Sequence, residues 1–170
     1  MKKSILRYST YGSITLGVLF AFGMLIGGSI DYSTSEIFGY ASMIISLLFV
    51  FFGIKHFRDK ENNGIVSFKK ALQIGVLISL IVAIVFGIID FIYVKFINPD
   101  FMTEYYAHSV EQFRTTLSEA EFQVKLEELE SQKDLFMNPF LTFLVMTMTV
   151  FVLGFIISLI SSLILQRKNQ

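Results

Sequence analysis

Four long apolar segments divide this chain, and the charged stretches between them alternate in sign. The segments cover residues 11–30, 37–54, 71–94 and 139–165, and the only charged residue inside them is Asp90. A helix that crosses the hydrocarbon core of a bilayer needs about 20 apolar residues. None of the segments has the polar face that a helix on the surface of a soluble protein carries. The pattern therefore predicts an all-α polytopic membrane protein with four transmembrane helices in a bundle.

The composition agrees with this class and excludes several kinds of chemistry. Hydrophobic residues make up 54% of the 170 residues, and the mean hydropathy is +0.63, which is too apolar for an ordinary soluble domain. There is no cysteine, so disulfides, thiol catalysis and a cysteine zinc site are excluded. Four crossings and one long loop account for nearly all of the chain, so a single integral membrane domain over residues 1–170 is expected.

The basic and acidic residues lie on opposite sets of flanks. Eleven of the 14 acidic residues belong to the turn at residues 31–36 and the loop at residues 98–138. Cytoplasmic flanks of membrane helices are enriched in Lys and Arg. The charges therefore predict four crossings with both termini in the cytoplasm. Ten of the 14 basic residues lie on the flanks assigned to that side: Lys2, Lys3, Arg7, Lys55, Arg58, Lys60, Lys69, Lys70, Arg167 and Lys168.

A second interpretation of the first segment is a cleaved signal peptide. Basic residues precede its apolar run, and Gly27 and Ser29 are small residues that could mark a cleavage site. The run is longer than the apolar part of a usual signal peptide, and another apolar segment follows after a short turn. An uncleaved first helix is the favoured interpretation, and cleavage would leave the remaining topology unchanged.

Small residues recur every four positions in the apolar segments, which places each row on one helix face. Membrane helices associate through such rows because the two backbones can approach closely. We interpret the rows as helix–helix seams, with the lining of a pore or cavity as the alternative. The rows are Ser9, Ser13, Gly17 and Ala21, a shorter pair at Ser42 and Ser46, then Gly75, Ser79, Ala83 and Gly87, and finally Gly154, Ser158 and Ser162.

The loop at residues 98–138 is predicted to form two amphipathic helices on the outer side. Asp100 can cap the first helix, and Ser118-x-x-Glu121 is a capping box that starts the second. Glu121 and Lys125 are spaced for an exposed ion pair. The helices could lie on lipid, cover the bundle or contact a partner. Apolar residues follow the helical period in both: Met102, Tyr106, Val110, Phe113 and Leu117, then Phe122, Leu126, Leu129 and Phe136.

Asp90 is the first candidate functional residue, because an ionisable group inside a membrane span is costly and often functional. It would then belong to a proton or cation relay. The alternative is a structural acid near the outer interface, which reaches the headgroups or bonds a nearby Tyr or Thr. Metal binding by Glu104, His108 and Glu111 on one helix face is a weaker possibility, and the interpretation adopted is that the chain has no metal site.

Lys55, His56 and Arg58 form the second candidate site, at the predicted cytoplasmic interface. Basic side chains there anchor a helix, and they can also contact acidic lipid headgroups. The remaining chain has no phosphate-binding glycine loop, no HExxH motif and no nucleophile elbow. We therefore expect no catalytic residue and no cofactor. A folded basic module for nucleic acid is also absent.

Several short motifs resemble a known family. They are Glu-Ile-x-Gly-Tyr at residues 36–40, Phe-Phe-Gly-Ile-Lys-His at 51–56, Arg-Asp at 58–59, Asn-Gly at 63–64, Ser-Phe-x-Lys-Ala-Leu at 67–72, Asn-Pro-Asp-Phe at 98–101 and Asn-Pro at 138–139. Together they resemble a bacterial family of small membrane proteins that share a domain of unknown function, number 4199. The resemblance implies a four-helix protein of the bacterial inner membrane. It implies no activity, and Asp90 lies outside its motifs.

The leading functional hypothesis is a non-enzymatic structural or interaction module of the cell membrane. Its expected partners are the lipid bilayer and a second copy of the chain or another membrane protein. The alternative is a small transporter or channel that acts as an oligomer, with Asp90 as its intramembrane ionisable group. A membrane-embedded enzyme ranks third, because no nucleophile, base or metal constellation can be assembled.

Overall fold

The computed structural model describes residues 1–27 and 30–167, and within them the chain is all-α, as predicted. The main helices are α1 (Lys2–Gly27), α2 (Tyr32–His56), α3 (Phe68–Ile92), α4 (Phe101–Thr116), α5 (Glu119–Met137) and α6 (Pro139–Leu165). Two short π-helical segments, η1 (Phe57–Glu61) and η2 (Tyr93–Ile97), continue α2 and α3. Ser29 and Lys168, which entered the sequence predictions, lie outside the described residues.

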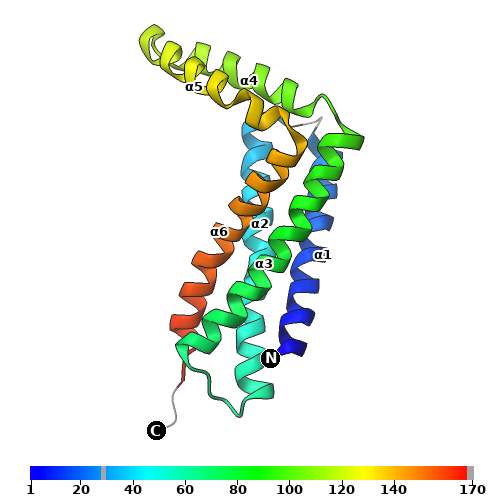
Figure 1. Cartoon of the computed structure of the whole chain (residues 1–170), viewed down its shortest axis with the longest axis vertical. Helices are drawn as coiled ribbons and strands as arrows, with labels where there is room; N and C mark the ends of the chain where they lie inside the picture. The colour runs from blue at the N-terminus through cyan, green and yellow to red at the C-terminus, as the bar shows by residue number, and fades with distance from the viewer. Residues whose placement is uncertain (28–29, 168–170) are drawn as a thin grey trace. The chain divides into compact units, whose positions relative to one another are not determined.

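The chain groups into two compact units. Unit 1 comprises Met1–Phe86 and the end of the chain from Thr147, and unit 2 comprises Gly87–Met146. Unit 1 holds α1, α2, most of α3 and the second half of α6, and Figure 1 shows α1 and α2 side by side within it. The expectation of a single membrane domain stays a prediction.

Four helices in the described part of the chain are long and apolar enough to cross a membrane. They coincide with the four predicted segments, but the first three helices begin earlier than the apolar runs. The start of α3 is capped by Ser67, because the backbone N–H of Lys70 donates to Ser67 Oγ at 3.4 Å. The start of α2 has a cap that the sequence analysis missed. Its N-cap residue Asp31 accepts a bond from the backbone N–H of Thr34 at 3.0 Å.

Two of the predicted small-residue rows, those of α3 and α6, pack against each other in unit 1. A Cβ added to Gly154 would lie 2.5 Å from Cβ of Ser79, and one added to Gly75 would lie 2.8 Å from Cβ of Ser158. The two hydroxyls are 3.2 Å apart, and both serines are fully buried. Each glycine thus accommodates a serine of the facing helix, so the two backbones pack with no free space between them.

The seam of α1 differs from the predicted row. Its buried face runs through Ile5, Ser9, Gly12 and Leu16, whereas Ala21, at the end of the predicted row, is exposed. Gly12 is the residue of close approach, since a Cβ added there would lie 3.1 Å from the carbonyl oxygen of Ser46 on α2. The spacing rule identified the kind of residue but not the face, because α1 carries small residues on more than one face.

Unit 2 contains the two amphipathic helices as predicted, and α4 and α5 form an antiparallel hairpin (Figure 1). The capping box at Ser118 and Glu121 is present, and the Glu121 carboxylate accepts bonds from both the N–H and the hydroxyl of Ser118. The predicted pair of Glu121 with Lys125 is wrong. Lys125 bonds Glu128 at 2.6 Å instead, because the Glu121 carboxylate is held at the cap.

The cap of α4 and the burial of the apolar stripes in unit 2 can also be compared with the predictions. Asp100 occupies the predicted N-cap position of α4, but its side chain makes no capping hydrogen bond. The apolar residues of both helices are mostly half-buried, with Met102 the buried exception among those described. The side chain of Phe136, the last residue of the predicted stripe, lies outside the described part.

Candidate functional site

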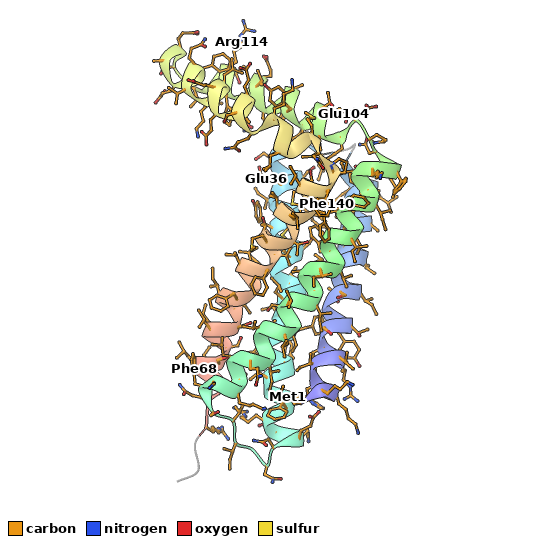
Figure 2. All side chains as sticks on the ribbon, viewed as in Figure 1. Met1, Glu36, Phe68, Glu104, Arg114 and Phe140 are labelled. Atoms are coloured by element: carbon orange, nitrogen blue, oxygen red, sulfur yellow. The ribbon has the colours of Figure 1, made fainter. Side chains whose placement is uncertain are left out.

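The basic end of unit 1 brings the three predicted cytoplasmic flanks together. Figure 2 places Met1 and Phe68 at this end and Glu36 at the other end of the unit. The first turn of α1, the end of α2 with η1, the loop before α3 and the end of α6 all contribute. Backbone bonds fix part of this arrangement, since Val66 and Arg167 form an isolated antiparallel bridge with N···O distances of 3.1 and 2.8 Å.

One cluster at this end, the His56 clasp, consists of Ser4, Arg7, His56 and Glu61. The ring Nδ1 of His56 lies 2.9 Å from Ser4 Oγ, and Nε2 lies 3.4 Å from an Arg7 guanidinium nitrogen. The Ser4 hydroxyl donates to Glu61 Oε1 at 2.9 Å. The clasp therefore ties the first two turns of α1 to the end of α2 and to η1. The Met1 amino group also pairs with Glu61.

Arg58 forms a second connection, from η1 to the end of α6. Its guanidinium donates two bonds to the adjacent Asp59, at 2.6 and 3.1 Å. A third bond, of 3.3 Å, goes to the carbonyl oxygen of Leu165. The last carbonyls of a helix lack partners within the helix, so Arg58 satisfies one of them and fixes the position of this helix end.

The loop between η1 and α3 is shaped by a tight turn at the predicted Asn63-Gly64. Both residues have positive φ, 52° at Asn63 and 81° at Gly64, a conformation that Asn and Gly adopt more readily than other residues. The N–H of Gly64 then donates to the carbonyl oxygen of Arg58 at 2.7 Å. This turn returns the chain toward α6, where Val66 meets Arg167.

The three residues predicted to contact lipid headgroups have different surroundings in the structure. Lys55 is exposed, so its ammonium group is accessible. Arg58 is only 8% exposed and is bonded to Asp59 and Leu165, and His56 belongs to the clasp. Headgroup contact stays a prediction for these three residues, of which His56 and Arg58 also connect helices.

Two residues of the clasp, Ser4 and Glu61, were missed by the sequence analysis. A signal for Glu61 was present, because Asp59 and Glu61 are the only acids on the basic flanks. An acid among many bases suggests a specific partner. Ser4 carries no comparable signal, since its role depends on the helix phase that places it beside His56.

Asp90 lies near the end of α3 in unit 2 and is 5% exposed. Its Oδ2 is buried and makes no hydrogen bond with any residue that the structure describes. One turn further along, the Lys95 ammonium lies over the rings of Phe91 and Phe96, 5.3 and 5.5 Å from their centroids. Both interpretations of Asp90, as a functional group and as a structural acid near the interface, stay predictions.

The possible metal trio on α4 is not supported. Within the described part of the chain, no group of three or more His, Asp or Glu side chains could hold a metal ion. Glu104 and Glu111 are exposed, as expected for charged residues on a wetted helix face.

Comparison with known families agrees with the resemblance in the motifs. The family described as "Protein of unknown function (DUF4199)" matches residues 7–167. The chain belongs to this family. The match includes Arg7, His56, Arg58, Glu61 and Asp90, but the DUF4199 description assigns no role to any residue. No match was found among the curated proteins or among the solved structures.

Proposed function

We propose that this DUF4199 protein is a non-enzymatic structural or interaction module of the bacterial inner membrane. In this proposal α1, α2, α3 and α6 cross the bilayer, the basic end of unit 1 faces the cytoplasm, and unit 2 presents its α4–α5 hairpin outside. The segregation of basic and acidic flanks supports this orientation.

The observation that carries the proposal is the closed seam between α3 and α6. A pore or substrate cavity along the small-residue rows would leave space beside the glycines. At Gly75 and Gly154 an added Cβ would instead meet a serine at 2.8 and 2.5 Å. This close contact supports packing as the use of the rows at these two positions.

The hairpin is the surface proposed for contact with a partner. Val124 on α5 is 65% exposed, and the polar face of the hairpin is mainly acidic. Ala120, four residues before Val124 on α5, is also exposed, and apolar patches rimmed by polar residues mark sites where proteins associate. The partner in this proposal is a second copy of the chain or another membrane protein.

Cysteine-directed crosslinking in native membranes tests the proposal, because the chain contains no cysteine of its own. We expect Val124→Cys to give one discrete adduct with a short bifunctional maleimide. Glu119→Cys, an exposed position on a different face of the same helix, is the matched control and should give none. If Val124→Cys also gives no adduct, and the purified protein has the mass of a monomer, the proposal is contradicted.

One observation favours transport as a second candidate function. The Oδ2 atom of Asp90 is buried without a hydrogen-bond partner among the described residues, and ionisable groups inside membrane spans often mark proton or ion pathways. Four spans are few for a transporter, so this function would require an oligomer. A proton or cation flux in proteoliposomes that Asp90→Asn abolishes would support transport, whereas no flux through the unmodified protein would exclude it.

A further inference from the structure

The hydrogen bonds of the His56 clasp specify which ring nitrogen carries the proton. An arginine guanidinium can only donate, so Nε2 of His56, 3.4 Å from Arg7, must accept. The neutral ring then carries its proton on Nδ1, which donates to Ser4 Oγ at 2.9 Å. The Ser4 hydroxyl donates in turn to Glu61 Oε1 at 2.9 Å. Every donor in this chain of bonds faces an acceptor only when the ring is neutral.

Protonation would place a second N–H on Nε2, directly toward the N–H of Arg7. Two donors and two positive charges would then face each other across 3.4 Å. The ring would be drawn toward Glu61, whose Oε1 lies 3.9 Å from Nδ1. That carboxylate is already shared with Ser4 and with the Met1 amino group.

The other groups around the His56 ring do not favour a positive charge on the ring in addition to that of Arg7. Lys55 precedes His56 on α2, and Tyr8 of α1 packs its ring 5.5 Å from the imidazole. Among the described residues, no charged side chain of α3 or α6 forms a hydrogen bond or ion pair with His56. Glu61 is therefore the one acid that pairs with the ring, against the cations of Arg7, Lys55 and the Met1 amino group.

We propose that the His56 clasp is a pH-sensitive switch, which holds the first turns of α1 against α2 and η1 while the ring is neutral and releases them when it is protonated. Histidine ordinarily changes its charge between about pH 5 and 8. The switch would operate in either of the two functions proposed above, because it lies in unit 1 and involves neither the hairpin nor Asp90.

The tautomer is tested by nitrogen-15 NMR of the full chain in nanodiscs of uncharged phosphatidylcholine. The chain has two histidines, so spectra of the variant His108→Asn assign the signals of His56. We expect the Nδ1–H tautomer at pH 8. A ring protonated mainly on Nε2 would overturn the proposal.

The release is tested by amide hydrogen exchange over residues 2–10, corrected for the intrinsic pH dependence of exchange. Protection should fall roughly tenfold between pH 8 and pH 5, about the effect of losing one hydrogen bond to a charged group. Asparagine can donate near the position of Nδ1 but does not titrate, so His56→Asn should remove this pH step. His108→Asn should leave the step unchanged.

A third variant separates the switch from simple loss of structure. Arg7→Met removes both the donor and the positive charge that would face a protonated ring, so it should reduce the size of the pH step in amide exchange over residues 2–10. A step of unchanged size in this variant would overturn the proposal. So would a pH step that persists in His56→Asn, or its absence from the unmodified chain.

Discussion

The α3–α6 seam of unit 1 and the α4–α5 hairpin of unit 2 were both predicted from helical periodicity, but they are packed differently. Ser79 and Ser158 in the seam are fully buried, whereas most apolar residues of the hairpin stay half-buried and Val124 is 65% exposed. Small residues let two backbones meet directly, so one facing helix is enough to bury them. Large side chains need neighbours on several sides.

This contrast assigns different roles to the two regions. Burial in the seam is complete within unit 1, which suits a support whose geometry does not change. The hairpin keeps apolar surface uncovered, which suits a region that becomes ordered or covered by contact with something else. The following substitutions test the contrast, from the largest expected effect to the smallest.

Matched glycine substitutions should have the largest effect. Gly154→Ala would place a Cβ 2.5 Å from Ser79, so it should lower the free energy of unfolding by about 2–3 kcal/mol through overpacking. Gly39→Ala, at a helical position with nothing within 4 Å of the added Cβ, should be neutral or stabilising by up to about 1 kcal/mol.

The free energy of unfolding of both variants is measured by denaturation in detergent mixtures. Adding Ser79→Gly to Gly154→Ala should recover part of the loss, because it removes the side chain that collides. Equal effects of the two alanine substitutions would mean that the seam is not closely packed.

The same valine-to-alanine change in both regions should have a smaller effect. Val50 on α2 is fully buried, whereas Val124 is largely exposed. Val50→Ala should lower the free energy of unfolding by about 1–2 kcal/mol through the cavity it leaves. Val124→Ala should stay within about 0.5 kcal/mol. A larger loss at Val124, measured in the same unfolding experiment, would show that the hairpin is already covered.

Acidification should loosen the start of α5 but leave the α3–α6 seam unchanged, and this is the smallest effect. Hydrogen bonds from Ser118 lower the pKa of Glu121 below its usual 4.5. A lowered pKa in the folded state means that the stabilisation is complete above about pH 4.5 and is lost as the pH falls through the lowered value.

Carboxyl carbon-13 shifts of Glu121 would report the lowered pKa, and exchange of the Ser118 amide would report the loss. Glu121→Gln should make that exchange independent of pH below 4.5 once intrinsic rates are removed. The α3–α6 seam has no acidic residue in unit 1, so its protection should not change in this range.

The helices themselves could be predicted because their signals are local. Apolar runs located α1, α2, α3 and α6, and the capping box located the start of α5. The face of α1 that packs could not be predicted, because the choice between Gly12 and Gly17 depends on which neighbour α1 meets. Local charge spacing also failed for Lys125, where two acids compete for one cation.

The candidate site was predicted only in part, for the same reason. The positions of Lys55, His56 and Arg58 near an interface followed from charge and hydropathy. Their partners are distant in sequence, since Ser4 precedes His56 by 52 residues and Leu165 follows Arg58 by 107. A single sequence does not show which residues that are far apart along the chain are in contact in the fold. The burial of Asp90 was not predicted, because apolar residues of the same segment such as Ile88 and Ile92 are exposed and only the neighbours of a helix decide which face is covered.

The reciprocal contacts of α3 and α6 also restrict how these helices can move. Gly75 faces Ser158 while Ser79 faces Gly154, so the two antiparallel helices interlock in one register. A slide of one step along the rows, about 6 Å at 1.5 Å per residue, would bring Ser79 opposite Ser158 in one direction and Gly75 opposite Gly154 in the other, so the fit of serine on glycine would be lost either way. Any rearrangement of the bundle should therefore carry these two helices together as a single body and take place at their contacts with α1 and α2.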